Sequence, residues 1–122
     1  QKPVTRDLAD EILKDFLYES LPTKITIPWI QKRVAQFYDI SETDLTGKRR
    51  SQALVLPRQI AMKLSQMLTD ASLSQIGEAF GGRDHTTVIH ACEKIQNLLN
   101  TDSEFKKEFE RVLKFVHPHG KL

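Results

Sequence analysis

Apolar residues recur along most of this chain at intervals of three and four positions, the spacing that places side chains on one face of an α-helix. Six such stripes are Leu8, Ile12, Phe16 and Leu17; Ile27, Ile30, Val34 and Phe37; Ile60, Leu64, Met67 and Leu68; Leu73, Ile76 and Phe80; Val88, Cys92, Ile95 and Leu99; and Phe105, Phe109, Val112 and Val116. The longest strand-like alternation is the short KITI at residues 24–27. The pattern therefore predicts an all-α fold in which the stripes share a core.

Capping residues predict where some of these helices begin and end. Thr26 can cap a helix with Pro28 in its first turn, and Ser41 can cap a short helix that ends at Gly47. We expect the next helix to be entered at Pro57, with its methionines filling gaps in the core.

The segment SLSQIGEAFGGRDHTTVIHA, residues 72–91, carries the clearest local pattern. Ser72 and Gln75 form an S-x-x-Q capping box, Gly81 can take a left-handed conformation at the helix end, and Asp84 can cap the following helix. Two helices joined by a tight glycine turn are the sequence form of a helix-turn-helix. A plain helical hairpin has the same form, so the exposed face must decide between them.

The exposed face of this second helix has the chemistry of a DNA reader. With Val88 on the buried side, Thr86 and His90 fall on the opposite side, and Asp84 and His85 lie at the tip. Threonine offers a methyl to the thymine C5-methyl, aspartate accepts from cytosine N4, and histidine donates or accepts. The free backbone N–H groups of the first turn can hold a phosphate.

Competing chemistry for the same stretch fits the spacing poorly. No G-x-x-x-x-G-K-[ST] is present, and GGRDH follows a helix rather than a strand, which argues against nucleotide hydrolysis in this chain. His85 and His90 point about 140° apart on a helix, so they cannot share a metal. Adjacent Asp84 and His85 rarely converge on one substrate atom, and no nucleophile stands out. We therefore expect neither a metal site nor an enzyme.

The final helix is expected to begin at Thr101, with Glu104 completing another capping box. The single cysteine, Cys92, lies on an apolar stripe and is expected in the core. No signal peptide pattern and no apolar run of about 18 residues occurs, so a cytoplasmic location is expected.

Basic residues are concentrated in the middle of the chain, although the formal net charge is only +2. Residues 46–90 contain 6 basic and 3 acidic side chains, whereas residues 1–45 contain 6 and 8. A basic loop at 48–50 precedes Arg58, Gln59 and Lys63. A loop arginine can enter a minor groove, while residues at a helix start bind phosphate; a solvated charged loop is the alternative.

The stretches IGEAFGGRDHTTVIHACEKI, residues 76–95, and KRRSQALVLPRQIAMKL, residues 48–64, are similar to the C-terminal DNA-binding domain of the bacterial DnaA replication-initiator family. The resemblance spans roughly residue 25 to the end. It implies a Trp-repressor-like helical bundle at residues 24–122, preceded at residues 1–23 by an amphipathic connector helix.

The resemblance implies binding of double-stranded DNA at DnaA boxes of a replication origin, initiation of chromosomal replication there, and regulation of transcription. The implied base contacts are Arg50 in the minor groove and Asp84, His85 and Thr86 in the major groove. The implied phosphate contacts are Arg58, Gln59, Ser72, Leu73, Thr87, His90 and Lys94.

The implied partners beyond DNA belong to a longer parent protein. They are an ATPase module that binds ATP or ADP with Mg, further copies of the protein assembled on the origin, and acidic phospholipids at the connector helix. This chain itself is expected to hold no cofactor. Residues 1–24 contain 4 basic and 5 acidic side chains, whereas a membrane-surface helix usually has a basic polar face. A helical module that binds a partner is the alternative to a DNA-binding domain.

Overall fold

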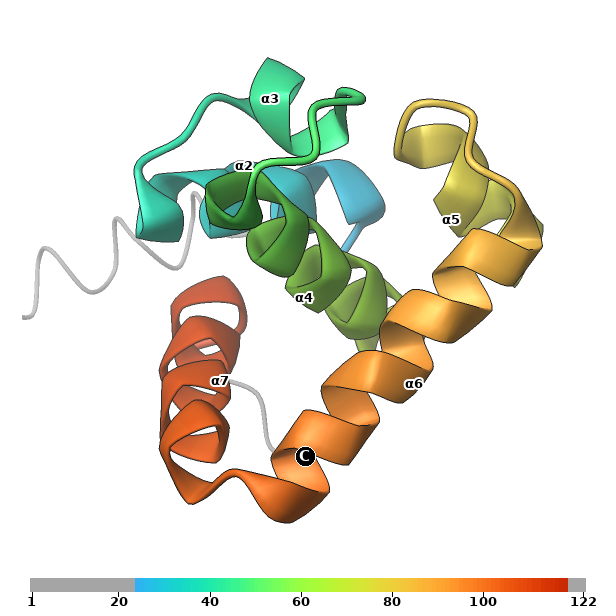
Figure 1. Ribbon diagram of the computed structural model, residues 1–122. Helices are drawn as coiled ribbons and strands as arrows, with labels where there is room; N and C mark the ends of the chain where they lie inside the picture. Colours follow the sequence, from blue (N-terminus) through green and yellow to red (C-terminus); the bar gives the residue numbers. More distant parts are fainter. Residues whose placement is uncertain (1–23, 119–122) are drawn as a thin grey trace, which may run out of the picture.

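The computed structural model describes residues 24–118, and these residues form an all-helical fold (Figure 1). The elements are α2 (Ile27–Tyr38), α3 (Glu42–Thr46), α4 (Gln52–Leu68), α5 (Leu73–Ala79), α6 (His85–Thr101) and α7 (Ser103–Val116). The predicted fold class is confirmed. The expected connector helix at 1–23 lies outside the described residues.

Helix α4 lies in the middle of the fold and packs against α2, α3 and α6, while α7 closes the other side against α2 and α6 (Figure 1). The predicted stripes supply most of the core, including Phe80, Val88, Ile95 and Phe109. One methionine departs from the expectation, because Met67 is exposed whereas Met62 is buried.

The predicted caps at the front of the chain are confirmed. Thr26 accepts a hydrogen bond from the backbone N–H of Trp29 at 3.3 Å, and Ser41 Oγ accepts from Asp44 N at 2.9 Å. Gly47 caps the end of α3 with an ordinary φ of −78°, so its role there is not a left-handed turn. The Ser41 and Gly47 caps fix the two ends of the short α3, immediately before the basic loop.

The predicted start of α4 at Pro57 is wrong, because the helix begins five residues earlier. The backbone N–H groups of Leu54 and Val55 both donate to the Ser51 carbonyl at 2.9 Å, which starts the helix at Gln52. Pro57 lies inside the helix and donates no hydrogen bond of its own. Arg58 and Gln59, which follow Pro57, therefore lie in the second turn of α4 and not at its N-terminus.

The predicted cap of α7 is also wrong by one residue. Asp102 is the N-cap, and its carboxylate accepts from Glu104 N and Phe105 N, each at 3.1 Å. Thr101 is instead the last residue of α6, where its hydroxyl donates to Asn97 O at 2.7 Å. A carboxylate accepting from two backbone N–H groups is a better cap than a hydroxyl already used by the preceding turn.

Polar contacts join α2 to α7 at the edge of the core. Trp29 Nε1 donates to Val116 O at 2.9 Å, and the Arg33 guanidinium lies 3.8 Å from the centre of the Phe115 ring. Tyr38 donates its hydroxyl to Glu108 at 2.5 Å; burial, this hydrogen bond and the carboxylate charge raise the pKa of Tyr38. These contacts join α7 to α2.

Candidate nucleic-acid interface

Helices α5 and α6 meet at a turn that only small residues can form. Gly81 and Gly82 have φ of +86° and +74°, in the left-handed region that favours glycine. A Cβ on Gly77 would lie 2.1 Å from the Arg83 carbonyl oxygen, and Arg83 N donates to Gly77 O at 2.8 Å. This close approach fixes the angle at which α6 leaves α5.

The leading residues of α6 form a connected polar tip. Asp84 is the N-cap, and its carboxylate accepts from His85 N at 3.0 Å and from the Thr86 hydroxyl at 3.1 Å. The ring nitrogen Nδ1 of His85 lies 3.2 Å from the same carboxylate. All three side chains are exposed. Because the Thr86 hydroxyl donates its proton to Asp84, Thr86 offers an external partner its methyl group and an acceptor oxygen, but no donor.

The rest of α6 separates into an apolar and a polar face, as its spacing predicts. Val88 and Ile95 are buried, whereas Thr87, His90 and Lys94 are exposed. Cys92 is buried, which confirms its predicted place in the core, and burial raises the pKa of its thiol.

A cleft of about 780 Å³ lies between α4, the basic loop before it and α6. The lining includes six of the expected DNA contacts: Arg50, Arg58, Gln59, Thr87, His90 and Lys94. It also includes Lys48, Gln52, Val55, Met62, Gly81, Gly82, Arg83 and Ala91. Five of these lining residues are lysine or arginine and none is acidic, so the cleft favours an anion.

The basic loop reaches this cleft with exposed side chains. Lys48, Arg49 and Arg50 are all exposed, and Lys48 and Arg50 line the cleft. Arg49 does not line the cleft, and its Nη1 lies 3.9 Å from the Asp44 carboxylate. Arg50 therefore has the exposure that a groove-entering residue requires.

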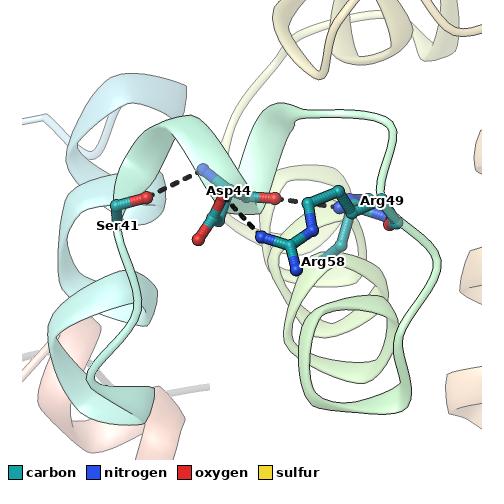
Figure 2. Close-up of polar contacts among 4 residues, drawn as sticks. All are labelled: Ser41, Asp44, Arg49 and Arg58. Atoms are coloured by element: carbon teal, nitrogen blue, oxygen red, sulfur yellow. Dashed lines mark hydrogen bonds and ion pairs between the residues drawn. The ribbon is translucent and has the colours of Figure 1, made fainter.

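Arg58, one of the expected phosphate contacts, also binds the protein's own backbone. Its side chain is buried, with 4% exposure, and it donates to the carbonyls of Leu45 (2.7 Å), Asp44 (2.9 Å) and Arg49 (2.9 Å). Figure 2 shows the guanidinium between Asp44 and Arg49. Burial, followed by the charge of Arg83, lowers the pKa of Arg58. Because α4 begins before Pro57, Arg58 lies on the buried face of the second turn and not at the helix start, where the sequence placed it.

The other expected phosphate contacts on α4 and α5 have mixed surroundings. Gln59 lines the cleft, and its Oε1 is buried without a hydrogen-bond partner among the described residues. Ser72 is exposed but is used in the predicted capping box, accepting from Gln75 N at 3.1 Å. Leu73 is half-buried against the core. Neither Ser72 nor Leu73 lines the cleft.

Arg83 is the residue whose role the sequence did not predict. Its Nη1 donates to Thr46 O at 3.2 Å and to Phe80 O, and its Nη2 donates to Gly47 O at 2.5 Å. These acceptors lie on two separate elements, so no local spacing indicates them. For the burial of Arg58, though not for its hydrogen-bond partners, a pattern was available, because Arg58 shares a helical face with the buried Leu54 and Ala61.

Residues 24–118 offer neither a metal site nor a membrane-spanning helix. In that range, no three His, Cys, Asp or Glu side chains gather closely enough to hold a metal ion. No helix within it is long and apolar enough to cross a membrane.

The comparison that decides the family covers the helix-turn-helix itself. A family model described as "Bacterial dnaA protein helix-turn-helix" matches residues 27–95, more than half of the chain. This chain belongs to the bacterial DnaA helix-turn-helix family. The DnaA match begins at the start of α2 and ends within α6, so it includes the basic loop, α5 and the polar tip. Helix α7 lies beyond it.

A full-length relative agrees with the DnaA assignment. The chromosomal replication initiator protein DnaA of Levilactobacillus brevis is 51% identical over 111 residues, which are 91% of this chain and 25% of that protein. The chain therefore spans about a quarter of the length of the curated DnaA relative it matches.

Proposed function

We propose that this chain is a sequence-specific double-stranded DNA-binding domain that recognises DnaA boxes during initiation of chromosome replication. Helix α6 lies in the major groove, where Asp84, His85 and Thr86 contact base edges, and Arg50 enters the adjacent minor groove. The proposal rests chiefly on the cleft, which is lined by lysine and arginine and by no acidic residue. The cleft lies between two exposed polar elements, the basic loop and the outward face of α6.

The polar tip of α6 supports base reading rather than simple charge attraction. A major groove admits one α-helix and presents a different pattern of donors, acceptors and methyl groups for each base pair. The Asp84 carboxylate accepts from the Thr86 hydroxyl and lies 3.2 Å from Nδ1 of His85, so both side chains have a partner at the tip before a duplex arrives. An acidic residue at this position weakens non-specific binding and favours a duplex that offers a matching donor.

Phosphate contacts are proposed for Thr87, His90 and Lys94 on α6, for Gln59 on α4, and for Ser72 and Leu73 at the start of α5. Thr87, His90 and Lys94 are exposed beside the cleft. Contacts of this class fix register and orientation on the duplex but do not read sequence. A phosphate contact is proposed for Arg58 as well: three of its five N–H groups bind backbone carbonyls, and the residue lines the cleft.

Connections to a longer protein follow from the family. We propose that residues 1–23 connect this domain to an ATPase module that binds ATP or ADP with Mg, and that copies of the parent assemble on the origin in the cytoplasm. Transcriptional regulation through the same boxes and contact between the connector and acidic phospholipids belong to the same proposal. Liposome binding at low salt, compared with and without residues 1–23, tests the lipid contact.

Fluorescence anisotropy tests the DNA-binding proposal. The chain is titrated into a duplex with a DnaA box and into a scrambled duplex of equal length, at several salt concentrations. We expect the chain to bind the box duplex more tightly than the scrambled one. If about six phosphates are neutralised, the slope of log affinity against log salt concentration should be about −5. Equal affinity for both duplexes contradicts box recognition, and the absence of any salt dependence contradicts phosphate binding.

A further inference from the structure

Two arginines donate hydrogen bonds to consecutive carbonyls at the end of α3. Arg58 binds the carbonyls of Asp44, Leu45 and Arg49, and Arg83 binds those of Thr46 and Gly47. Figure 2 shows the Arg58 half of this arrangement. The two guanidiniums come from α4 and from the turn before α6, so three elements meet at one short stretch of backbone.

The end of α3 needs such partners. The last carbonyls of an α-helix have no acceptor role within the helix, and α3 has only five residues with no basic residue in its last turn. Cations at a helix C-terminus are favourable, and a guanidinium can donate to several oxygens at fixed angles. Within the segment, Gly47 N donates to Asp44 O at 3.3 Å, and the arginines supply donors to this carbonyl and to the three that follow it.

The helix-turn-helix turn lies directly against this segment. A Cβ on Gly81 would lie 2.4 Å from the Thr46 carbonyl oxygen. Arg83 N also donates to Gly77 O, so the backbone that carries the guanidinium is tied to α5. Arg83 directly precedes the Asp84 cap, so its side chain links the start of α6 to the carbonyl of Gly47.

The held segment leads straight to the loop arginine assigned to the minor groove. Arg50 is three residues after Gly47, and the charge of Arg50 is close enough to contribute, after burial, to the lowered pKa of Arg83. A shift of the Gly47 backbone would therefore move the base from which the Arg50 side chain extends.

We propose that Arg83, assisted by Arg58, is a positioning residue that sets where Arg50 lies relative to α6, so that reading in the two grooves is coupled. The inference rests on the proposed function, because it assigns how the two DNA-reading elements are kept in register. Arg83 acts here through backbone carbonyls rather than by touching a base.

Arg83→Lys separates positioning from charge. Lysine keeps the positive charge but not the planar fork that reaches Thr46 and Gly47 together. Its matched control is Arg111→Lys, the same exchange at an exposed position on α7 outside the cleft. Affinities are measured for a box duplex with an I·C pair in the Arg50 half, and for the same duplex with G·C there. These pairs differ only by an amino group in the minor groove.

We expect Arg83→Lys to weaken box binding about fivefold to tenfold and to reduce the preference for I·C over G·C, while Arg111→Lys changes neither more than twofold. In an Arg50→Ala background, Arg83→Lys should change affinity less than twofold. Two results would overturn the positioning role. One is an Arg83→Lys variant that keeps the full preference for I·C over G·C. The other is a double variant whose loss of affinity equals the product of the losses in the two single variants.

A measurement on the unaltered chain keeps the proposal testable if Arg83→Lys does not fold. NMR of the guanidinium groups should show hindered rotation of Arg58 and Arg83 and free rotation of the exposed Arg50, without DNA present. Free rotation of Arg83 would overturn the inference. If the unaltered chain shows no preference for a box, the proposed function fails instead, and that result is distinct from a box-specific chain whose Arg83 is free.

Discussion

The Nε of Arg58 donates to the carbonyl oxygen of Leu45 at 2.7 Å, joining the second turn of α4 to the end of α3 in the interior of the fold. Arg58 is as buried as the apolar core, yet its charge is matched by three backbone carbonyls rather than by a buried carboxylate. This contact makes stability, and not only DNA affinity, depend on Arg58.

Replacement of Arg58 by alanine should lower the free energy of unfolding by about 2 to 4 kcal/mol, because it leaves up to three carbonyls without their donors. Urea unfolding followed by circular dichroism measures the change. Arg111→Ala, at an exposed position, is the control and should stay within about 0.5 kcal/mol of the unaltered chain. If the two alanine variants are equally stable, Arg58 is not a structural residue.

Glycines of the helix-turn-helix should differ sharply in their tolerance of alanine. A Cβ on Gly77 would meet the Arg83 carbonyl at 2.1 Å, whereas one on Gly82 meets nothing within 4 Å and faces only the strain of a φ of +74°. We expect Gly82→Ala to cost about 1 to 2 kcal/mol, and Gly77→Ala to cost more because the backbone must move.

Thermal unfolding of both alanine variants checks this order. Gly77→Ala should also weaken box binding in its folded fraction, since the angle between α5 and α6 changes. Equal melting temperatures for Gly77→Ala and Gly82→Ala would show that the close approach at Arg83 does not constrain the turn.

Tyr38 should make stability sensitive to alkaline pH. Burial and the Glu108 carboxylate raise its pKa above the ordinary value near 10. A group whose pKa is raised by folding contributes stability below its unfolded pKa and loses it as pH rises through the folded value. The free energy of unfolding should therefore fall above about pH 10.

Urea unfolding between about pH 9 and 11.5 tests the tyrosine, with Tyr38→Phe as the comparison. The phenylalanine variant lacks the ionisable hydroxyl, so its stability should fall less steeply over this range, while lysine titration affects both chains alike. Parallel curves for the two chains would contradict the assignment.

Local chemistry explains which features the sequence predicted. The Asp84 cap, the Ser72–Gln75 capping box and the apolar stripe that buries Val88 depend on residues within one or two helical turns of each other. The family resemblance, which depends on two contiguous stretches, was likewise confirmed by the comparisons. The exposure of Arg50 and Thr86 agrees with their assigned roles, although their contacts with DNA remain predictions.

Features that depend on distant partners were not predictable in this way. Arg58 finds its acceptors 9 to 14 residues away, and Arg83 finds two of its acceptors 36 and 37 residues away. Pro57 was misread because proline usually marks a helix start, whereas here the first turn had already formed around the Ser51 carbonyl. Such contacts become visible only when the elements are assembled.

The most direct test that both grooves are read compares Thr86→Ala with Arg50→Ala. Each variant is measured on two DNA changes that alter one chemical group in one groove. Replacing a box thymine by deoxyuridine removes only a major-groove methyl, and replacing an I·C pair by G·C adds only a minor-groove amino group. For the unaltered chain, we expect the methyl to be worth about 0.8 kcal/mol and the added amino group to cost about 1 to 3 kcal/mol.

Anisotropy competition with each duplex gives the decisive result. Thr86→Ala should lose only the sensitivity to the thymine methyl, and Arg50→Ala should lose only the sensitivity to the minor-groove amino group. Sensitivity of the unaltered chain to neither change, or equal loss of both sensitivities in each variant, would contradict the account that α6 and the basic loop read opposite grooves.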